Sequence, residues 1–256
     1  MHMEMRKKKL YGVLAFCVVL LSACLGDPAT QLTMANQAGV VVTGYGPGKV
    51  IYTKGDVVIS SDEFQSANVE NGECILFDYS IDYGSTANAS AGTDTSYMTA
   101  TIYENTIAEV DRWQLQDTQI DTTSVNRGEL LLSSLQARSA YIRGNLFLFT
   151  EMSNHQANQR DSFSLSYNSS QTLGDEKIYD LYLRAVLLES DTTAGQSMIV
   201  PCAFDIQKFV NDAAKRNGTS EVKFRINYAS AFGKDSLSIS AWKLSDVFTI
   251  DLSGKE

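Results

Sequence analysis

The glycine-rich stretch GYGPGK at residues 44–49 has the composition of a loop that could bind phosphate. Loops of the Gly-x4-Gly-Lys-Ser/Thr type surround phosphate with backbone N–H groups and place a hydroxyl on magnesium. In this chain Thr43 stands where the first glycine is needed, Val50 replaces the hydroxyl, and Pro47 removes one N–H donor. The stretch therefore predicts a tight turn between two strands and not a nucleotide site.

Histidine, the commonest catalytic base, is scarce in this chain. The two histidines are His2, close to the start, and His155, which lies in the polar segment TEMSNHQANQ. A histidine in such a segment is expected to be a solvated loop residue without a catalytic role. A zinc site of several His and Cys ligands cannot be assembled, and no Asp-x-Asp-x-Asp-Gly run for calcium is present. We therefore predict no metal and no cofactor.

Carboxylates offer the remaining route to catalysis, because two of them on either side of a glycosidic bond can hydrolyse it. Asp78 and Asp82 share one face of a predicted strand, as many solvent-facing acids do. Since nothing selects them as a pair, we predict no catalytic residues and no enzyme. A carboxylate hydrolase stays as one alternative.

The Cys24 thiol has the clearest chemistry of the chain. Four basic residues, Arg6 to Lys9, precede an apolar run from Leu10 to Leu21. Twelve helical residues rise about 18 Å, well short of the roughly 30 Å hydrocarbon core of a membrane, so the run is typical of a secretory signal. Leu21-Ser22-Ala23-Cys24 resembles the bacterial lipobox. This resemblance implies a signal peptide at 1–23, lipid attachment at Cys24 and a tether at 24–38.

The charge of the chain limits its partners. Removal of residues 1–23 takes away four basic residues and Glu4, which leaves 17 basic and 29 acidic residues and a net charge of −12. Such a charge argues against nucleic acid and against electrostatic docking on anionic lipid. Cys74 and Cys202 remain in an oxidising compartment, where they either pair in a disulfide or stay as small buried side chains.

The pattern beyond residue 38 predicts an all-β protein. Strands are expected within 40–60, at 73–82 and at 96–104, where apolar residues alternate with polar ones or are interrupted by Gly and Pro. A polar stretch at 115–128 marks the predicted domain boundary, which gives domains at 39–120 and 121–256. Six further strands, near 140–150, 161–168, 177–188, 220–229, 235–242 and 246–252, indicate a β-sandwich.

One helix interrupts the strands, in the segment FDIQKFVNDAAKRNG. Ile206, Phe209, Val210 and Ala213 fall at helical spacing, so one stripe is expected to face a core. Asp205 is the predicted N-cap. Gly218 is expected to end the helix in the left-handed conformation.

The order of these segments resembles a known family. NGECILFDYSI, MTATIYENTIAEV, IRGNLFLFTEM, DSFSLSYN, LYLRAVLLES, AFDIQKF and VKFRINYAS follow one another as in the NigD-like lipoproteins of Bacteroidetes. The resemblance implies an N-terminal OB-like small β-barrel, followed by a C-terminal immunoglobulin-like β-sandwich with one short helix. It also implies lipid anchoring at the bacterial outer membrane. A single Asp follows Cys24 closely, instead of an acidic cluster that marks surface export, so the periplasmic and the cell-surface side both stay open.

The sequence predicts only the general class of function. We expect a non-enzymatic envelope lipoprotein with a binding or structural role. One alternative is a glycan-binding accessory lipoprotein that uses Trp113 or Trp242; another, suggested by the family name, is a bacteriocin-immunity or partner-binding protein. Three triplets resemble O-glycosylation acceptors, and their candidate acceptor residues are Thr122, Thr192 and Ser236.

Overall fold

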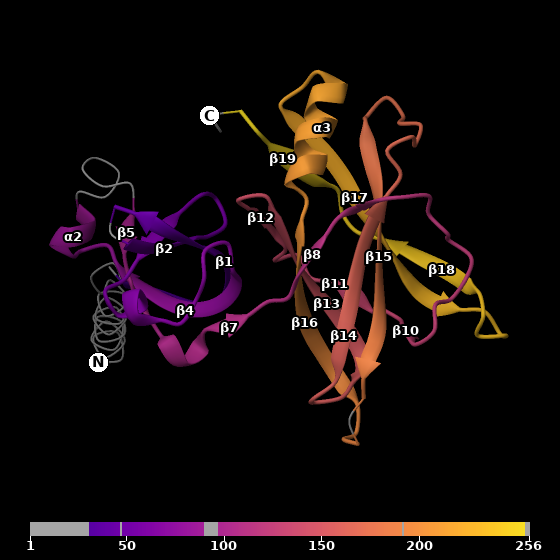
Figure 1. Ribbon diagram of the computed structural model, residues 1–256, viewed down its shortest axis with the longest axis horizontal. Coiled ribbons are helices and arrows are strands. Elements are labelled where there is room, and N and C mark those ends of the chain that lie inside the picture. Colours follow the sequence, from indigo (N-terminus) through magenta and orange to yellow (C-terminus); the bar gives the residue numbers. More distant parts are fainter. Residues whose placement is uncertain (1–30, 47, 90–96, 191, 254–256) are drawn as a thin grey trace, which may run out of the picture.

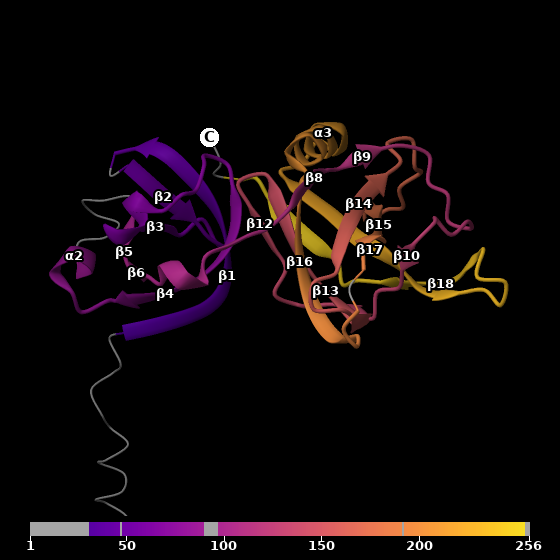
Figure 2. The ribbon, with the colours of Figure 1, turned by 60° about the horizontal axis from the view of Figure 1, so that its bottom comes forward.

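The computed structural model describes residues 31–46, 48–89, 97–190 and 192–253. Within them strands dominate, and they form two domains that lie side by side (Figures 1 and 2). The all-β prediction is confirmed. Cys24 lies outside the described residues.

The N-terminal domain is one sheet that closes on itself. Its strand order is β5-β3-β2-β1-β4-β6, with β7 also on β4. The two end strands of this order, β5 and β6, are separated in the chain by a single residue, Ala100, so the sheet curls into a small barrel. The elements are β1 (Gln31–Tyr45), β2 (Gly48–Tyr52), β3 (Val58–Ser60), η1 (Glu63–Ser66), β4 (Cys74–Asp82), α2 (Thr86–Ala89), β5 (Met98–Thr99), β6 (Thr101–Ile102), η2 (Glu104–Thr106) and β7 (Ala108–Glu109).

Strand β4 follows the predicted alternation. Ile75, Phe77, Tyr79 and Ile81 are all buried in the barrel core, with Phe64 of η1 fully buried among them. Burial of such side chains contributes about 1.5–3 kcal/mol each relative to exposure. The barrel is therefore held by its own apolar core.

The expected tether is shorter than predicted. Gln31 already pairs with Asp82, and β1 continues along β4 to the Val40–Cys74 pair. Residues 31–38 thus belong to the barrel and not to a tether. Their polar composition fits a strand whose side chains largely face solvent.

The C-terminal domain is a sandwich of two sheets. One has the order β18-β17-β15-β14-β9, with β10 on β15 and β19 on β17; the other has the order β11-β13-β16-β8, with β12 on β13. The strands are β8 (Arg112–Gln114), β9 (Gln116–Asp117), β10 (Glu129–Leu130), β11 (Ser134–Leu135), β12 (Ala140–Ile142), β13 (Asn145–His155), β14 (Arg160–Tyr167), β15 (Ile178–Glu189), β16 (Gln196–Asp205), β17 (Glu221–Phe232), β18 (Ile239–Leu244) and β19 (Phe248–Asp251).

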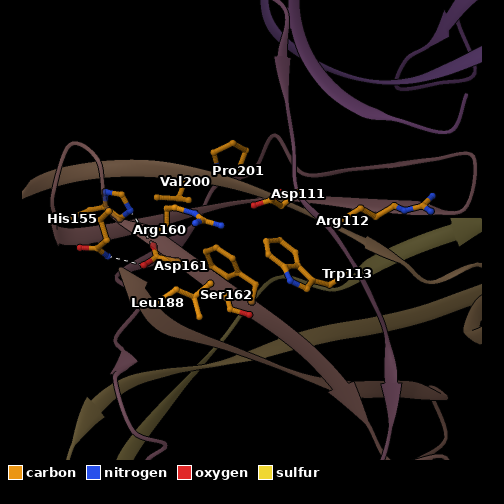
Figure 3. Close-up of a pocket in the computed structure, with 12 residues that line it drawn as sticks. Asp111, Arg112, Trp113, His155, Arg160, Asp161, Ser162, Leu188, Val200 and Pro201 are labelled. Carbon is orange, nitrogen blue, oxygen red and sulfur yellow. Dashed lines mark hydrogen bonds and ion pairs between the residues drawn. The ribbon is translucent and has the colours of Figure 1, made fainter. Parts of the chain in front are cut away.

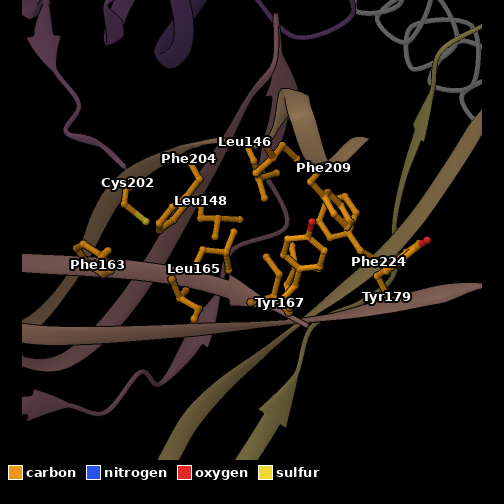
Figure 4. Packing of buried hydrophobic residues seen from close by; sticks show 14 of the residues in the cluster. Leu146, Leu148, Phe163, Leu165, Tyr167, Tyr179, Cys202, Phe204, Phe209 and Phe224 are labelled. Atoms are coloured by element: carbon orange, nitrogen blue, oxygen red, sulfur yellow. The ribbon is translucent and has the colours of Figure 1, made fainter. Parts of the chain in front are cut away.

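The sandwich core contains aliphatic and aromatic side chains from both sheets (Figure 4). Phe209 of α3 (Gln207–Asn217) packs edge-to-face on Tyr167, Tyr179 and Phe224, so the helix closes one end of the sandwich. Gly218 has a φ of 64° and caps the helix as predicted. The N-cap is Ile206 and not Asp205, whose side chain nevertheless accepts the N–H of Gln207.

The two domains meet earlier in the chain than 115–128. Barrel pairing ends with β7 at Glu109, and β8 at 112–114 already pairs with β16 of the sandwich. The chain therefore changes domain near residues 110–111, and residues 112–120 lie with the sandwich. Polarity misled the prediction because β8 and β9 are short edge strands whose side chains are mostly exposed.

A shared apolar cluster joins the two domains. Val40 and Cys74 of the barrel pack with Phe147, Phe149 and further residues on the outer face of the β13 sheet. In addition, the guanidinium of Arg143 lies 4.4 Å from the ring centroid of Tyr52. Because these side chains are buried from both sides, the barrel is docked on the sandwich by a hydrophobic contact.

Candidate functional site

A cleft of about 380 Å³ lies at the open side of the sandwich, next to the domain junction (Figure 3). The cleft forms because β14 and β16 lack a strand partner there. Strand β9 covers only the Ser166–Tyr167 end of β14, and β8 covers only the Ala203–Asp205 end of β16. Its lining residues are Asp111, Arg112, Trp113, His155, Gln159, Arg160, Asp161, Ser162, Phe163, Leu188, Val200 and Pro201.

Three polar side chains form a hydrogen-bonded group in the wall of this cleft. Nε2 of His155 lies 3.0 Å from Oδ2 of Asp161, and the side chains are 7% and 2% exposed. The amide of Gln159 donates to Oδ1 of Asp161 at 2.8 Å. Nδ1 of His155 is buried and has no hydrogen-bond partner among the described residues.

The structure thus overturns the expectation that His155 is a solvated loop residue. Strand β13 extends to His155, and its register with β16 shifts between Met152 and His155. Strict alternation from Met152 would turn Asn154 inward. The irregularity exposes Asn154 and buries His155 instead.

Asp161 was also missed, although the sequence carries a signal for it. Phe163, Leu165 and Tyr167 alternate along β14 and all face the core. Asp161 continues this series at the same spacing. A carboxylate in line with core residues is a candidate for a buried, partnered acid.

Trp113 lines the cleft and also contacts the sandwich core. Its ring packs edge-to-face on Phe163 at 5.4 Å and tilted on Phe204 at 5.9 Å. The side chain is half-buried, so one part supports the core while another part lines the cleft. Around it, Arg112 and Arg160 are exposed, and Arg160 pairs with Glu189 at 2.9 Å.

Trp242 occupies a different surface. Its Nε1 donates to the carbonyl of Thr122 at 3.0 Å, and its ring packs edge-to-face on Tyr182. It lines none of the described cavities. Of the two predicted aromatic candidates, Trp113 is the one that lines the cleft.

Cys74 and Cys202 are free thiols, so the candidate disulfide does not form. Neighbouring residues of β16 face opposite sides of the sheet: Ala203 packs in the junction cluster with Cys74, whereas Cys202 points into the sandwich core. Burial raises the pKa of the Cys74 thiol to about 12 and also raises that of Cys202. Both thiols are therefore protonated and unreactive in the folded protein.

The candidate O-glycosylation residues have different surroundings. Ser236 and Thr192 are exposed, whereas Thr122 is half-buried. Asp121, beside Thr122, accepts hydrogen bonds from the backbone N–H groups of Thr123 and Ser124, which lower the pKa of its carboxyl group. Modification of these residues stays a prediction.

Two features of the described residues bear on metal binding and membrane spanning. No group of three or more His, Cys, Asp or Glu side chains is placed to hold a metal ion within them. Their helices are also too short or too polar to cross a membrane.

Comparison with known proteins identifies the first domain. Residues 29–107 match the family model described as the lipoprotein OB domain. The N-terminal domain is a lipoprotein OB domain. This match confirms the predicted OB-like barrel, whereas lipid anchoring at the outer membrane stays a proposal.

Solved structures resemble this chain over most of its length. An uncharacterized protein from Parabacteroides merdae is 20% identical, with a TM-score of 0.73 over 86% of this chain and 99% of that chain. A protein of unknown function from Bacteroides vulgatus is 11% identical, with a TM-score of 0.52 over 88% and 93%. A NigD-like immunity protein from Bacteroides caccae is 12% identical, with a TM-score of 0.47 over 85% and 96%.

At these identities the likeness to the first two structures shows the fold alone. Among curated proteins, none matches the chain.

Proposed function

We propose that this protein is a non-catalytic lipoprotein of the outer membrane that binds a glycan in the Trp113 cleft. The observation that carries the proposal is the cleft itself, in which a half-buried tryptophan lies near buried and exposed polar side chains. Ligand sites of proteins usually combine apolar walls with a few fixed polar groups in about 300–1,000 Å³. The cleft volume, about 380 Å³, is at the lower end of this range and suits one or two sugar units.

The lining favours a hydroxylated ligand over an apolar one. An aromatic ring offers a flat apolar surface, while carboxylate, amide and guanidinium groups offer both acceptors and donors. Asp111 supplies an acceptor, and the exposed Arg112 and Arg160 supply donors. A sugar presents apolar C–H faces and hydroxyl groups together, which matches this mixture.

Binding to glycans is tested first. The mature protein, screened against soluble host and bacterial polysaccharides by calorimetry, is expected to bind at least one of them. Trp113→Ala should weaken that binding about tenfold or more, since buried aromatic anchors dominate such contacts. Trp242→Ala is the matched control, because it removes a half-buried tryptophan from outside the cleft.

The melting temperature of each variant separates lost contacts from lost folding. Equal affinity in wild type and Trp113→Ala would contradict the assignment of the cleft. Release of oligosaccharide products would contradict the non-catalytic part of the proposal.

The lipid anchor gives a separate prediction. Cys24→Ala should leave the protein as an unprocessed precursor or release it from the membrane fraction, because acyl chains on Cys24 supply the attachment. Radiolabelled palmitate is the measurement. Equal incorporation into wild type and variant would rule out Cys24 as the modified residue.

A further inference from the structure

We propose that a groove between the two domains is a second binding site, and that it takes an organic amine with an apolar ring system. This junction groove has a volume of about 610 Å³ and shares no lining residue with the Trp113 cleft. The inference does not depend on the proposed function, and it adds a ligand of a different chemical class.

The junction groove lies on the side of the sandwich opposite the Trp113 cleft. Strands β11 and β12 border one sheet on that side, and β18 and β19 border the other. The turn between β2 and β3 of the OB domain, residues 54–56, forms a further wall. Strands β12 and β19 both lie where the sandwich faces the barrel (Figures 1 and 2). Ligand sites often occur between domains, and the volume is in their usual range of about 300–1,000 Å³.

Tyr228 supplies a polar group inside the groove. The residue is 6% exposed, and its ring packs in the sandwich core. Its hydroxyl has no hydrogen-bond partner among the described residues, yet it is not one of their polar atoms that are sealed from solvent without a partner. The hydroxyl is therefore accessible, and the tyrosine lines the junction groove. A ligand in the groove can form the hydrogen bond that the protein leaves unmade.

Apolar side chains surround this hydroxyl. Phe248 stacks on Phe224, with ring centroids 5.1 Å apart and an angle of 8° between the planes. Leu244 and Val247 also line the groove, and they are 54% and 46% exposed. Exposed apolar groups that gather at one place are typical of a binding surface. The groove thus offers a flat apolar body a surface on which to pack.

The charges at the groove select a cation. Asp56, Asp246 and Asp251 line it, whereas Lys54 is the single basic residue among its lining residues. The carboxylate of Asp246 is exposed and has no hydrogen-bond or ion-pair partner in the part of the chain that the structure describes. Complementary charge attracts a ligand, and like charge repels it. An ammonium group next to Asp246 would supply the missing partner, which a carboxylate or a neutral sugar does not.

Tryptamine is the probe for this site, because it joins an indole ring to an ammonium group. Indole-3-propionate is the matched probe, with the same ring and the opposite charge. In calorimetric titrations of the mature protein, we expect tryptamine to bind at least tenfold more tightly than indole-3-propionate. Equal affinities, or no binding of tryptamine, would overturn the inference.

The role of Tyr228 is tested with Tyr228→Phe, which keeps the ring and removes only the hydroxyl. The variant should weaken tryptamine binding about three- to tenfold, the effect of one lost hydrogen bond. Its melting temperature should stay close to that of the wild type, because the hydroxyl has no partner in the described protein. 1-Methyltryptamine lacks the ring N–H that donates to the hydroxyl, and it should bind wild type and variant equally.

The role of the charge is tested with Asp246→Asn, which should also weaken tryptamine binding. Asp62→Asn is the matched control, since it removes an exposed carboxylate that does not line the groove. If Tyr228→Phe and Asp246→Asn both bind tryptamine as the wild type does, the probe adheres to the acidic surface in general and the inference is wrong.

Two measurements place the probe and separate the two sites. The backbone N–H signals of Gly55 and Val247, which line the groove from the two domains, should shift together when tryptamine is added. Trp113→Ala should bind tryptamine like the wild type, although it is expected to lose glycan affinity. Loss of tryptamine binding in Trp113→Ala, with the groove signals unmoved, would place the amine in the Trp113 cleft and overturn the inference, while glycan binding would be judged from its own screen.

Discussion

Arg184→Met should lower the free energy of unfolding by about 3–5 kcal/mol, the usual cost of removing one partner of a buried ion pair. Arg184 donates through Nε to Oε1 of Glu129 at 2.6 Å and also contacts its Oε2. The Glu129 side chain is fully buried and that of Arg184 is 14% exposed. Without the guanidinium, a carboxylate would be left unpaired away from solvent.

Arg184 also holds the segment that follows the domain junction. Its guanidinium donates to the carbonyls of Asp121 and Ser124, at 3.2 and 2.5 Å. The variant should therefore release residues 118–128 as well as destabilise the fold. Hydrogen exchange of the backbone N–H of Val125, which is bonded to the carbonyl of Leu237, reports this release.

Urea unfolding followed by circular dichroism measures the stability change, and two variants make the result specific. Arg160→Met applies the same substitution to the exposed Arg160–Glu189 pair, with side chains 67% and 63% exposed, and should cost at most about 1 kcal/mol. The double variant Arg184→Met with Glu129→Leu should regain part of the loss, because an apolar pair replaces an unpaired charge. A double variant as unstable as Arg184→Met alone would show that the ion pair is not the cause.

Much of the fold could be predicted because burial leaves a period in the sequence. Strand β15 alternates Tyr179, Leu181, Leu183 and Ala185 inward, and α3 repeats apolar residues at helical spacing. In both elements the core-facing side chains keep the same spacing along the whole length of the element. Where this holds, the pattern and the structure agree within a few residues.

Strand β16 was not among the predicted strands, and Pro201 explains why. Proline lacks the N–H that an interior strand must donate, so its presence argues against a strand. In the structure β16 has β13 along one edge, whereas β8 covers the other edge only at Ala203–Asp205. Pro201 stands where that second edge is open and no donor is needed, a fact of tertiary structure that the local sequence does not contain.

The candidate site was harder to predict because it too depends on tertiary structure. Cleft residues come from five strands, the loop between β13 and β14 and the domain junction, and they form no motif in the chain. Trp113 was named from its residue type alone, while His155 was misjudged because one irregularity in β13 reverses its side. Only Asp161 could have been found, from its place in line with Phe163.

The junction between the domains gives the second large prediction. Phe147 is fully buried, yet it lies on the outer face of its sheet, where the OB domain covers it. Phe147→Ala should cost about 3–5 kcal/mol, because truncating a buried phenylalanine loses apolar contact and leaves a cavity. The cavity would lie between the domains, so the variant should also weaken their docking.

Calorimetric unfolding distinguishes these two effects. In the wild type, the apolar junction should make the OB domain and the sandwich unfold together, since a buried hydrophobic contact couples domains more strongly than a polar one. In Phe147→Ala two separate transitions are expected. Phe232→Ala is the matched control: this phenylalanine is half-buried on β17, away from the junction, and its loss should cost less and keep one transition. A single transition in Phe147→Ala at the wild-type temperature would mean that this contact neither stabilises the fold nor couples the two domains, whereas two transitions already in the wild type would mean that the barrel and the sandwich unfold as independent modules.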